Sequence, residues 1–530
     1  MSEDISVQGR WSGLLVAAVV FVALSFYLHT RSENIADLDG LYHFRHSALY
    51  ASRGLTDSSF PWTEFSVVKK EGADPWYGFH LLLIPFTYFS DSVIGLKAAS
   101  IFVTALSAFL IFLAFRRLGT RWPVFWVIAL FFSSPDFLFR FTALRPQLIS
   151  FGLILLLFSY ILSKVDVKKI PYLCLFFVSL AIAWVHLAFA WMLFFPLLAI
   201  GFFARTQRQR IGFAPFLYMV AGTVAAILLH PNILGTLKLT YVQVVRLLWE
   251  KQAGTPLLFG TEMLRFTSQN FWDQFVPITL LLAVALYFWI KLSGGRHPDT
   301  IQRLPGLKIA LFSSAFLASV FFYLSFSSAR RSADFFFGFA LIFVGLVFSR
   351  VADRIRLREL FSGRKLLVSL LFFALVGVMA GVSFVRYQDA VQKSYDPRAA
   401  QEVGEWLIEN SKSGDIVFHP LWDQFAQLFF WNTQNRYING MDPIFEYVYD
   451  PSLYWKHHFF STDWAGEFTC PAQRCTADML EDSYKALKDD FRADFVYLQK
   501  NRNPRLFGYL AGDARYKKVF ENEKEAIFSL

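Results

Sequence analysis

The sequence predicts a polytopic α-helical membrane protein with a small C-terminal α/β domain, and three observations support this fold class. Hydrophobic residues make up 55% of the 530 residues, with 62 Phe and a mean hydropathy of +0.40, more than one water-soluble core can hold. Long apolar segments recur up to residue 386 and then stop. The tail that follows has the shorter periodicities of mixed helices and strands.

The apolar segments predict about eleven transmembrane helices. A bilayer core about 30 Å thick needs roughly 20 apolar residues per helix. Segment 170–204 is too long for one span and is expected to turn near Trp184–His186, while 80–89 is too short to cross and should lie on the membrane surface. The expected spans are 11–30, 93–115, 122–141, 143–163, 170–185, 187–204, 211–229, 274–292, 307–325, 334–350 and 365–386.

These spans define two domains. Residues 1–386 form the expected transmembrane domain, with a first outer loop at 31–92 and a long outer loop at 231–273 that is long enough to act as a lid. Residues 387–530 form the expected soluble extracytoplasmic α/β domain.

The distribution of charge predicts the orientation. The net charge of +10 is carried in short basic clusters between the spans, which is typical of cytoplasmic loops and argues against a nucleic-acid partner. With a cytoplasmic N-terminus, five clusters fall inside and the tail falls outside, as expected for a bacterial inner membrane protein. These clusters lie at 116–121, 164–169, 205–210, 291–303 and 350–365.

The tail shows several short elements. Helical spacing covers 398–410 and 479–491, and strand patterns cover 415–418, 495–499 and 516–520. Cys470 and Cys475 lie close together, and two alternatives stay open: a local disulfide outside the cytoplasm, or two separate thiols.

A motif rich in acids, aromatic residues and basic residues follows the first span, from Asp37 to Arg45. Its apolar residues recur at three- and four-residue intervals, which predicts a short amphipathic helix on the outer membrane surface. Asp39 then occupies the place of a helix N-cap, which is one interpretation of this residue. The other is chemical, because a carboxylate can act as a general base or hold a divalent cation that neutralises a phosphate. The apolar positions are Leu41, Phe44, Ala48, Ala51 and Leu55.

Other groups suited to phosphate and sugar are expected on the same outer face. Arginine suits phosphate because its guanidinium is always charged and can bind two oxygens at once. Each of these residues has a structural alternative as a helix-end anchor or a polar residue at a turn. They are Asp136, Arg140, Arg145, Gln147, His186, His230, Asn232, Arg330 and Arg331.

Two motifs resemble those of GT-C fold glycosyltransferases, and distantly those of the catalytic subunit of oligosaccharyltransferases. Asp39–Arg45 is similar to the aspartate motif of their first outer loop. Segment 415–425, with Trp422 and Asp423, resembles their acceptor-recognising motif, and 439–443 follows at a similar distance. The resemblance implies an inverting transfer of a sugar from a polyprenyl-phosphate or diphosphate donor to a glycan, lipid or protein acceptor at the outer face.

The resemblance also implies roles for individual residues. Asp39, with Asp37 as the next choice, would be the catalytic base, and Asp39 with Asp136 would hold Mg²⁺ or Mn²⁺ if a metal is used. The donor phosphate would be bound by Arg145, His186, Arg330 and Arg331. Donor or acceptor would contact Tyr42, His43, Arg45, Asp74, His80, Gln147, His230, Asn232, Glu262, Trp422 and Asp423.

Three alternatives to this function stay open. The first is an oligosaccharyltransferase or glycan ligase, which the tail motif favours. The second is a transporter or flippase of a lipid-linked substrate, although transporters usually carry ionisable residues at the bilayer midplane and the predicted spans have almost none there. The third is a membrane protein without catalytic activity.

Overall fold

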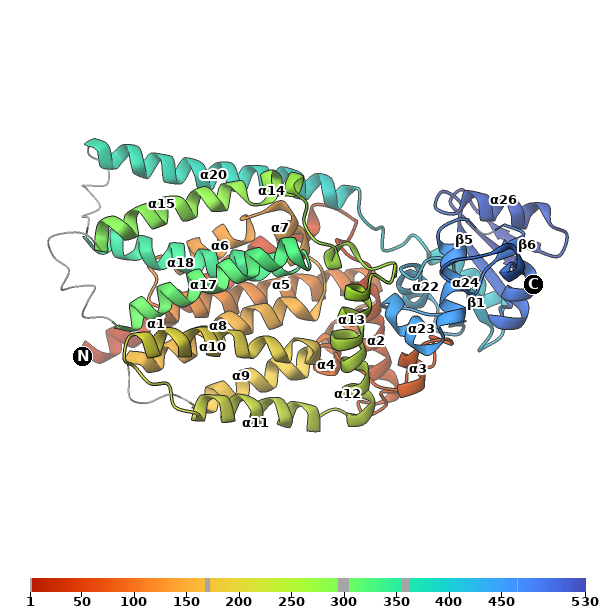
Figure 1. The fold of residues 1–530 in the computed structure, drawn as a ribbon, viewed down its shortest axis with the longest axis horizontal. Helices are drawn as coiled ribbons and strands as arrows, with labels where there is room; N and C mark the ends of the chain where they lie inside the picture. The colour runs from red at the N-terminus through yellow and green to blue at the C-terminus, as the bar shows by residue number, and fades with distance from the viewer. Residues whose placement is uncertain (1, 167–171, 294–304, 355–362, 465) are drawn as a thin grey trace. The chain divides into compact units, whose positions relative to one another are not determined.

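The computed structural model describes residues 2–166, 172–293, 305–354, 363–464 and 466–530, and these are mostly helical (Figure 1). The chain divides into two compact units. The first unit contains Met1–Ala36, Lys97–Ile227 and Gly260–Ser394, and the second contains Asp37–Leu96, Leu228–Phe259 and Tyr395–Leu530. The first outer loop and the tail thus belong to the same unit.

The first unit is built from helices alone within the described residues. In chain order they are α1 (Ser2–Thr30), α5 (Ser92–Arg117), α6 (Pro123–Phe131), α7 (Pro135–Phe141), α8 (Pro146–Asp166), α9 (Tyr172–Val185), the 3₁₀-helix η2 (Leu187–Leu193), α10 (Phe194–Thr206), α11 (Ala214–Leu228), η4 (Thr261–Met263), α14 (Ser268–Gln274), α15 (Val276–Ser293), α17 (Pro305–Ser327), α18 (Ser332–Arg354) and α20 (Gly363–Gln392).

The described helices confirm a multi-pass membrane protein. Five are long and apolar enough to cross a membrane, and the number rises to eight if each of three bent helix pairs is one span. The predicted total of eleven also includes shorter apolar helices such as α9, and it stays a prediction. Residues 167–171, 294–304 and 355–362, which hold parts of three basic clusters, lie outside the described residues.

One predicted span is bent, whereas the sequence predicts a single helix there. Segment 122–141 forms α6 and α7, which meet at 102°. The break is encoded locally, because Ser134 accepts a hydrogen bond from the Phe137 N–H and Pro135 stands at the first position of α7. Helices α14 and α15 meet at 68°, but α14 ends at Gln274, so this bend lies at the start of the predicted span 274–292. The turn predicted at His186 is confirmed, since α9 ends at Val185.

Helix α18 forms the centre of the first unit. It is the most buried of the apolar helices and packs against α17, α15 and α6. Aromatic rings fill the contacts: Phe275 lies 5.5 Å from Phe337, and Phe137 lies 5.7 Å from Phe337, measured between ring centroids. Phenylalanine carries much of the packing here because each ring buries a large apolar area.

The second unit combines the first loop, part of the long loop and the tail. Its helices and strands are α2 (Asp39–Arg53), α3 (Val67–Glu71), α4 (Tyr77–Leu83), η1 (Ile84–Tyr88), α12 (Ile233–Tyr241), the π-helix η3 (Val242–Arg246), α13 (Leu247–Ala253), α21 (Gln401–Asn410), β1 (Ile416–Phe418), α22 (Gln424–Trp431), β2 (Arg436–Tyr437), α23 (Pro443–Tyr449), α24 (Pro451–Ser461), β3 (Phe468–Thr469), η5 (Ala477–Met479), β4 (Glu481–Asp482), α25 (Ser483–Lys485), the π-helix η6 (Ala486–Asp490), β5 (Phe495–Gln499), α26 (Pro504–Gly512), β6 (Lys517–Glu521) and β7 (Glu525–Ser529).

A mixed sheet with strand order β2-β1-β5-β7-β6 organises the tail. β1 pairs in parallel with β2 and β5, whereas β7 pairs antiparallel with β5 and β6. The strands predicted at 415–418, 495–499 and 516–520 are confirmed as β1, β5 and β6. Segment 479–491 instead contains β4 before its helical turns, and Cys470 and Cys475 form a disulfide.

The first loop extends this sheet. Tyr437 of β2 donates its N–H to the Trp62 carbonyl at 2.7 Å, and its own carbonyl accepts from the Glu64 N–H at 2.7 Å. The Phe65 N–H donates to the Ile438 carbonyl at 2.8 Å, and the Phe65 side chain joins the buried core of the tail. The amphipathic helix expected after Asp39 is confirmed as α2, and it packs against α22.

The two tail motifs pack directly on each other at Gly440. A Cβ atom at this position would lie 2.3 to 2.7 Å from ring atoms of Phe425. Replacing Gly440 with Ala should therefore lower the free energy of unfolding by about 1–3 kcal/mol through overpacking, measured as a lower melting temperature of the purified protein in detergent.

Gly508 provides the matched control for this change. It lies in the helix α26, and no atom stands within 4 Å of a Cβ placed there. The Gly508→Ala variant should melt at the same or a slightly higher temperature, because Ala favours the helix. Equal stability of the two variants would contradict the close packing at Gly440.

Candidate functional site

The first-loop motif places its two acids at the start of α2. Leu38 occupies the N-cap position without a side-chain capping bond, so Asp39 is the first helical residue. The interpretation of Asp39 as the N-cap is therefore wrong. Its carboxylate stands in the first turn, where the partial positive charge of the helix N-terminus favours a negative group. Asp37 and Asp39 are both partly exposed.

Helix α2 buries a polar and aromatic face that the apolar pattern did not indicate. Leu41 and Phe44 are buried as expected, while Leu55 lies beyond the helix and is 52% exposed. The buried residues also include Tyr42, His43, His46 and Tyr50, which follow Asp39 at three- and four-residue steps. The helix face that carries Asp39 therefore also carries the buried rings of Tyr42, His43, His46 and Tyr50.

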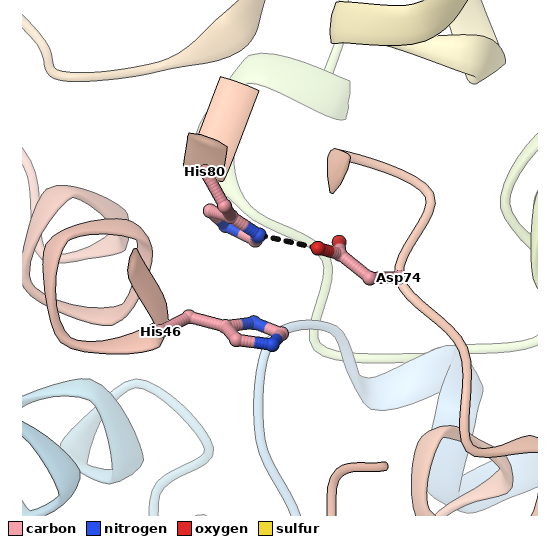
Figure 2. A group of neighbouring side chains, drawn as sticks. All are labelled: His46, Asp74 and His80. Carbon is pink, nitrogen blue, oxygen red and sulfur yellow. Dashed lines mark hydrogen bonds and ion pairs between the residues drawn. The ribbon is translucent and has the colours of Figure 1, made fainter. Parts of the chain in front are cut away.

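This row leads to a buried group formed with Asp74 and His80 (Figure 2). The Asp74 carboxylate Oδ2 lies 2.6 Å from His80 Nδ1 and accepts from the Tyr50 hydroxyl at 3.1 Å. Asp74 Oδ1 accepts from the Trp76 N–H at 2.9 Å. His80 Nε2 shares a hydrogen with His43 Nδ1 at 2.8 Å, so the chain Asp74–His80–His43 is continuous.

The charges in this group are set by its surroundings. Burial opposes ionisation of Asp74, but His80, His46 and the hydrogen bonds from His80 and Trp76 hold the pKa of its carboxyl well below its usual range. Burial, together with the charge of His80, lowers the pKa of His46 to about 3. Asp74 is therefore an anion at neutral pH, and His46 is a neutral imidazole.

The tail motif lies in the same unit as the first-loop acids. Asp423 forms a double ion pair with Arg502, at 3.1 and 3.0 Å, directly before α22. Burial raises the pKa of Tyr395, and the charges of Asp423, Asp37 and Asp39 raise it further. The acids of both motifs therefore act electrostatically on the same tyrosine. Trp422 is partly exposed beside them.

Other predicted substrate contacts in this unit have structural partners. Arg45 donates to the Thr433 hydroxyl at 3.4 Å. Asn232 caps α12 through the Gly235 N–H and donates to the Glu71 carbonyl at 2.7 Å. The His230 ring packs 5.8 Å from the ring of Tyr77. Substrate binding by these residues stays a prediction.

The first unit contains a second cluster, in which Glu262 joins predicted phosphate-binding residues. The Glu262 carboxylate pairs with Arg145 and, at 3.3 Å, with Arg140. The Arg331 N–H donates to the Glu262 carbonyl at 3.2 Å, and the charges of Arg331 and Glu262 both act on His186. Burial opposes ionisation of Glu262, but Arg145, Arg140 and Arg331 lower the pKa of its carboxyl to about 2.

The cluster extends to two further acids. Asp334 accepts from Arg140 at 2.9 Å. Asp136 accepts from the Gln274 amide at 3.0 Å and interacts electrostatically with Arg140 and Arg330. The Arg330 guanidinium also lies 5.2 Å from the ring centroid of Phe266. The cluster contains four arginines and three carboxylates, so ionised side chains leave one positive charge in excess. The arginines are Arg140, Arg145, Arg330 and Arg331, and the acids are Asp136, Glu262 and Asp334.

The structure thus brings the predicted residues together in two separate groups. Arg145, His186, Glu262, Arg330 and Arg331 meet in the first unit, whereas the first-loop and tail residues meet in the second. Asp39 and Asp136 belong to different units, so a shared metal stays a prediction. Gln147 lies in the first turn of α8.

Some residues of both groups were missed from the sequence. Asp334 was missed because it and Arg140 come from helices far apart in the chain, so their pairing leaves no trace in the sequence. His46 could have been found, because it follows Asp39 by seven residues, about two helical turns, and so shares its face.

Comparison with solved structures identifies the fold. The structure of ArnT from Cupriavidus metallidurans bound to undecaprenyl phosphate is similar, with a TM-score of 0.56 and 12% identity over 98% of each chain. The arabinofuranosyltransferase AftD from Mycobacteria matches with a TM-score of 0.56 and 13% identity, over 98% of this chain and 40% of that chain. The Archaeoglobus fulgidus oligosaccharyltransferase has a TM-score of 0.49 and 11% identity, over 97% of this chain and 73% of that one.

The chain therefore has the GT-C fold of polytopic membrane glycosyltransferases. No protein-family model matches the sequence. No curated protein matches it either. At 12 to 13% identity, the likeness establishes the fold and leaves substrate and mechanism to the site residues.

Glu262 offers a direct test of the arginine cluster. The Glu262→Gln variant should lose about 1–3 kcal/mol of stability, because Arg140 and Arg145 keep their charges while their shared carboxylate is lost. The melting temperature of the purified protein measures this loss. The control is Asp389→Asn, in an exposed pair with Lys393, which should change stability by less than about 0.5 kcal/mol. Equal melting temperatures for the two variants would contradict a structural role for Glu262.

Proposed function

We propose that this protein transfers a sugar from a polyprenyl-phosphate or diphosphate donor to an acceptor at the outer face of the membrane, with Asp39 as the base. The GT-C fold supports glycosyl transfer in general. The finer proposal rests on the residues of the two units.

The observation that carries the proposal is the packing of the first loop on the tail motif. Helix α2, which begins with Asp39, packs against α22, which begins directly after Trp422 and Asp423. The ring of Tyr42 lies 6.2 Å from that of Phe429, and Phe44 lies 6.1 Å from Phe430. Two motifs about 380 residues apart in sequence, each singled out for its chemistry, therefore belong to one structural group.

Asp39 is suited to act as a base on an acceptor hydroxyl. It is partly exposed, while the Asp74 carboxylate is buried and occupied by hydrogen bonds. The carboxylate takes the hydroxyl proton as the acceptor oxygen attacks the anomeric carbon from the face opposite the phosphate. The bond from that carbon to the phosphate oxygen breaks, the phosphate leaves with the electron pair, and the anomeric centre inverts. Asp37 is the second choice for this role.

The arginine cluster of the first unit is suited to the donor phosphate. Arginine binds two phosphate oxygens at once, and the cluster carries one positive charge in excess. The ArnT structure is bound to undecaprenyl phosphate, which supports a lipid phosphate as the donor group here. In this proposal Arg145, Arg330, Arg331 and His186 bind the phosphate, and Glu262 keeps the guanidinium groups in place.

A metal ion is compatible with the two acids assigned to it. Carboxylate oxygens are the ligands that Mg²⁺ and Mn²⁺ prefer, and Asp136 already holds a fixed orientation through Gln274. Such an ion would supply positive charge for the leaving phosphate. The chain would lie in a bacterial inner membrane, with its N-terminus in the cytoplasm and its tail outside.

The test compares wild type with Asp39→Asn on a pool of polyprenyl-phosphate sugars. Sugar release by the purified protein should fall by about 10²–10⁴-fold in the variant at an unchanged melting temperature, because the amide keeps the shape and loses the base. The assay is run with and without Mg²⁺ or Mn²⁺ and with candidate acceptors.

The matched control is Asp57→Asn in the same loop. Asp57 pairs with Arg53 on the surface, at 2.7 Å, and should tolerate the change. Equal turnover by wild type and Asp39→Asn would show that Asp39 is not the catalytic base. Tight lipid binding without turnover in both proteins would favour a transporter instead.

A further inference from the structure

We propose that His46, Asp74 and His80 bind a divalent transition-metal ion of the zinc class at a buried site in the second unit. One ligand atom from each residue lies within 4.8 Å of the other two. The imidazole rings of His46 and His80 are 4.3 Å apart between centroids, and Figure 2 shows both rings grouped with the Asp74 carboxylate. This site is distinct from the acids Asp39 and Asp136.

The chemistry of the donor set selects the metal. Two imidazole nitrogens and one carboxylate oxygen are typical ligands of Zn²⁺ and its neighbours, whereas Mg²⁺ and Ca²⁺ prefer sites made of oxygen alone. A metal also requires an ionised carboxylate and neutral histidines.

Each of the three ligand residues forms a hydrogen bond to a second group, through an atom that does not bind the metal. His80 Nε2 bonds to His43 at 2.8 Å, which leaves Nδ1 for the metal. His46 Nδ1 bonds to the Tyr42 hydroxyl at 2.9 Å, which leaves Nε2. Asp74 Oδ1 accepts from the Trp76 N–H, and Oδ2, which faces His80 Nδ1 and accepts from the Tyr50 hydroxyl, is the oxygen for the metal. Metal ligands usually have such outer partners, which fix the tautomer and the orientation of each ring. The outer partners are His43, Tyr42 and Trp76.

The geometry requires only small side-chain movements. Ligand atoms at about 2.0–2.2 Å from a tetrahedral ion stand roughly 3.3 Å from one another. The present 2.6 Å contact between His80 and Asp74 would open by less than an ångström, and the ligand atom of His46 would move closer to the other two. The Tyr50 hydroxyl, which already bonds to Asp74, or a water molecule would complete the fourth position.

The ion would have a structural effect on the proposed catalytic loop. His46 comes from α2, whereas Asp74 lies in the segment before α4 and His80 lies in the last turn of α4. Binding would therefore fasten the helix that begins with Asp39 to the other end of the first loop. All three residues are at most 3% exposed, so the ion would be shielded from competing ligands in solution.

Metal content and thermal stability test the proposal without any assay of activity. Purified wild-type protein, treated with a chelator and then given Zn²⁺, should bind about one ion per chain by elemental analysis. Its melting temperature should rise by about 5 °C, because the ion binds only the folded state. Mg²⁺ at the same concentration should produce no rise. Binding of no Zn²⁺, or an equal rise with Mg²⁺, would overturn the proposal.

Variants then locate the ion. His46→Gln and Asp74→Asn should each lose the bound ion and the rise in melting temperature, whereas His458→Gln, on α24 of the same unit, should keep both. If a ligand variant does not fold, Co²⁺ added to the wild-type protein should give the visible absorption of a tetrahedral site with nitrogen and oxygen ligands. Retention of the ion in both folded ligand variants, or an octahedral Co²⁺ spectrum, would overturn the site.

Discussion

Backbone hydrogen bonds between the first loop and the tail are the constraint on which the second unit depends. Segment 62–65 continues the sheet beside β2, and Phe65 enters the core formed by the tail. Glu64 strengthens this attachment, because its buried carboxylate pairs with Lys69 of the loop and with Arg436 and Arg492 of the tail. Once the loop is held in this way, α2 lies against α22 and the acids of both motifs share one unit.

Buried charge is handled differently in the two units. In the first, Glu262 and Asp334 neutralise arginines directly within the cluster. In the second, the buried Asp74 carboxylate is surrounded by a tyrosine, a backbone N–H and imidazole rings. Such a fully bonded polar group is rigid, which suits a helix that must present a reactive residue at its first turn.

The sequence indicated the fold more completely than it indicated the site. Helix α2 and the strands β1, β5 and β6 follow from local periodicity, and each was predicted close to its observed position. The bend between α6 and α7 was missed, although Ser134 and Pro135 encode it. A search for about twenty consecutive apolar residues does not detect a helix cap inside the segment. His46 and Tyr50 were missed for a related reason, since the search for an apolar face overlooked buried polar rings.

The sequence by itself determined the class of protein, its GT-C resemblance and the residue types able to carry glycosyl transfer. These properties depend on composition and on neighbours within a few helical turns. Only the tertiary structure decided which of these residues meet: Glu262 with Arg140 and Arg145, Asp74 with His80 and His46, and α2 with α22. Such contacts join segments far apart in the chain. They are selected by packing and by the cost of leaving buried charge unpaired, and neither is expressed in the order of residues along one chain.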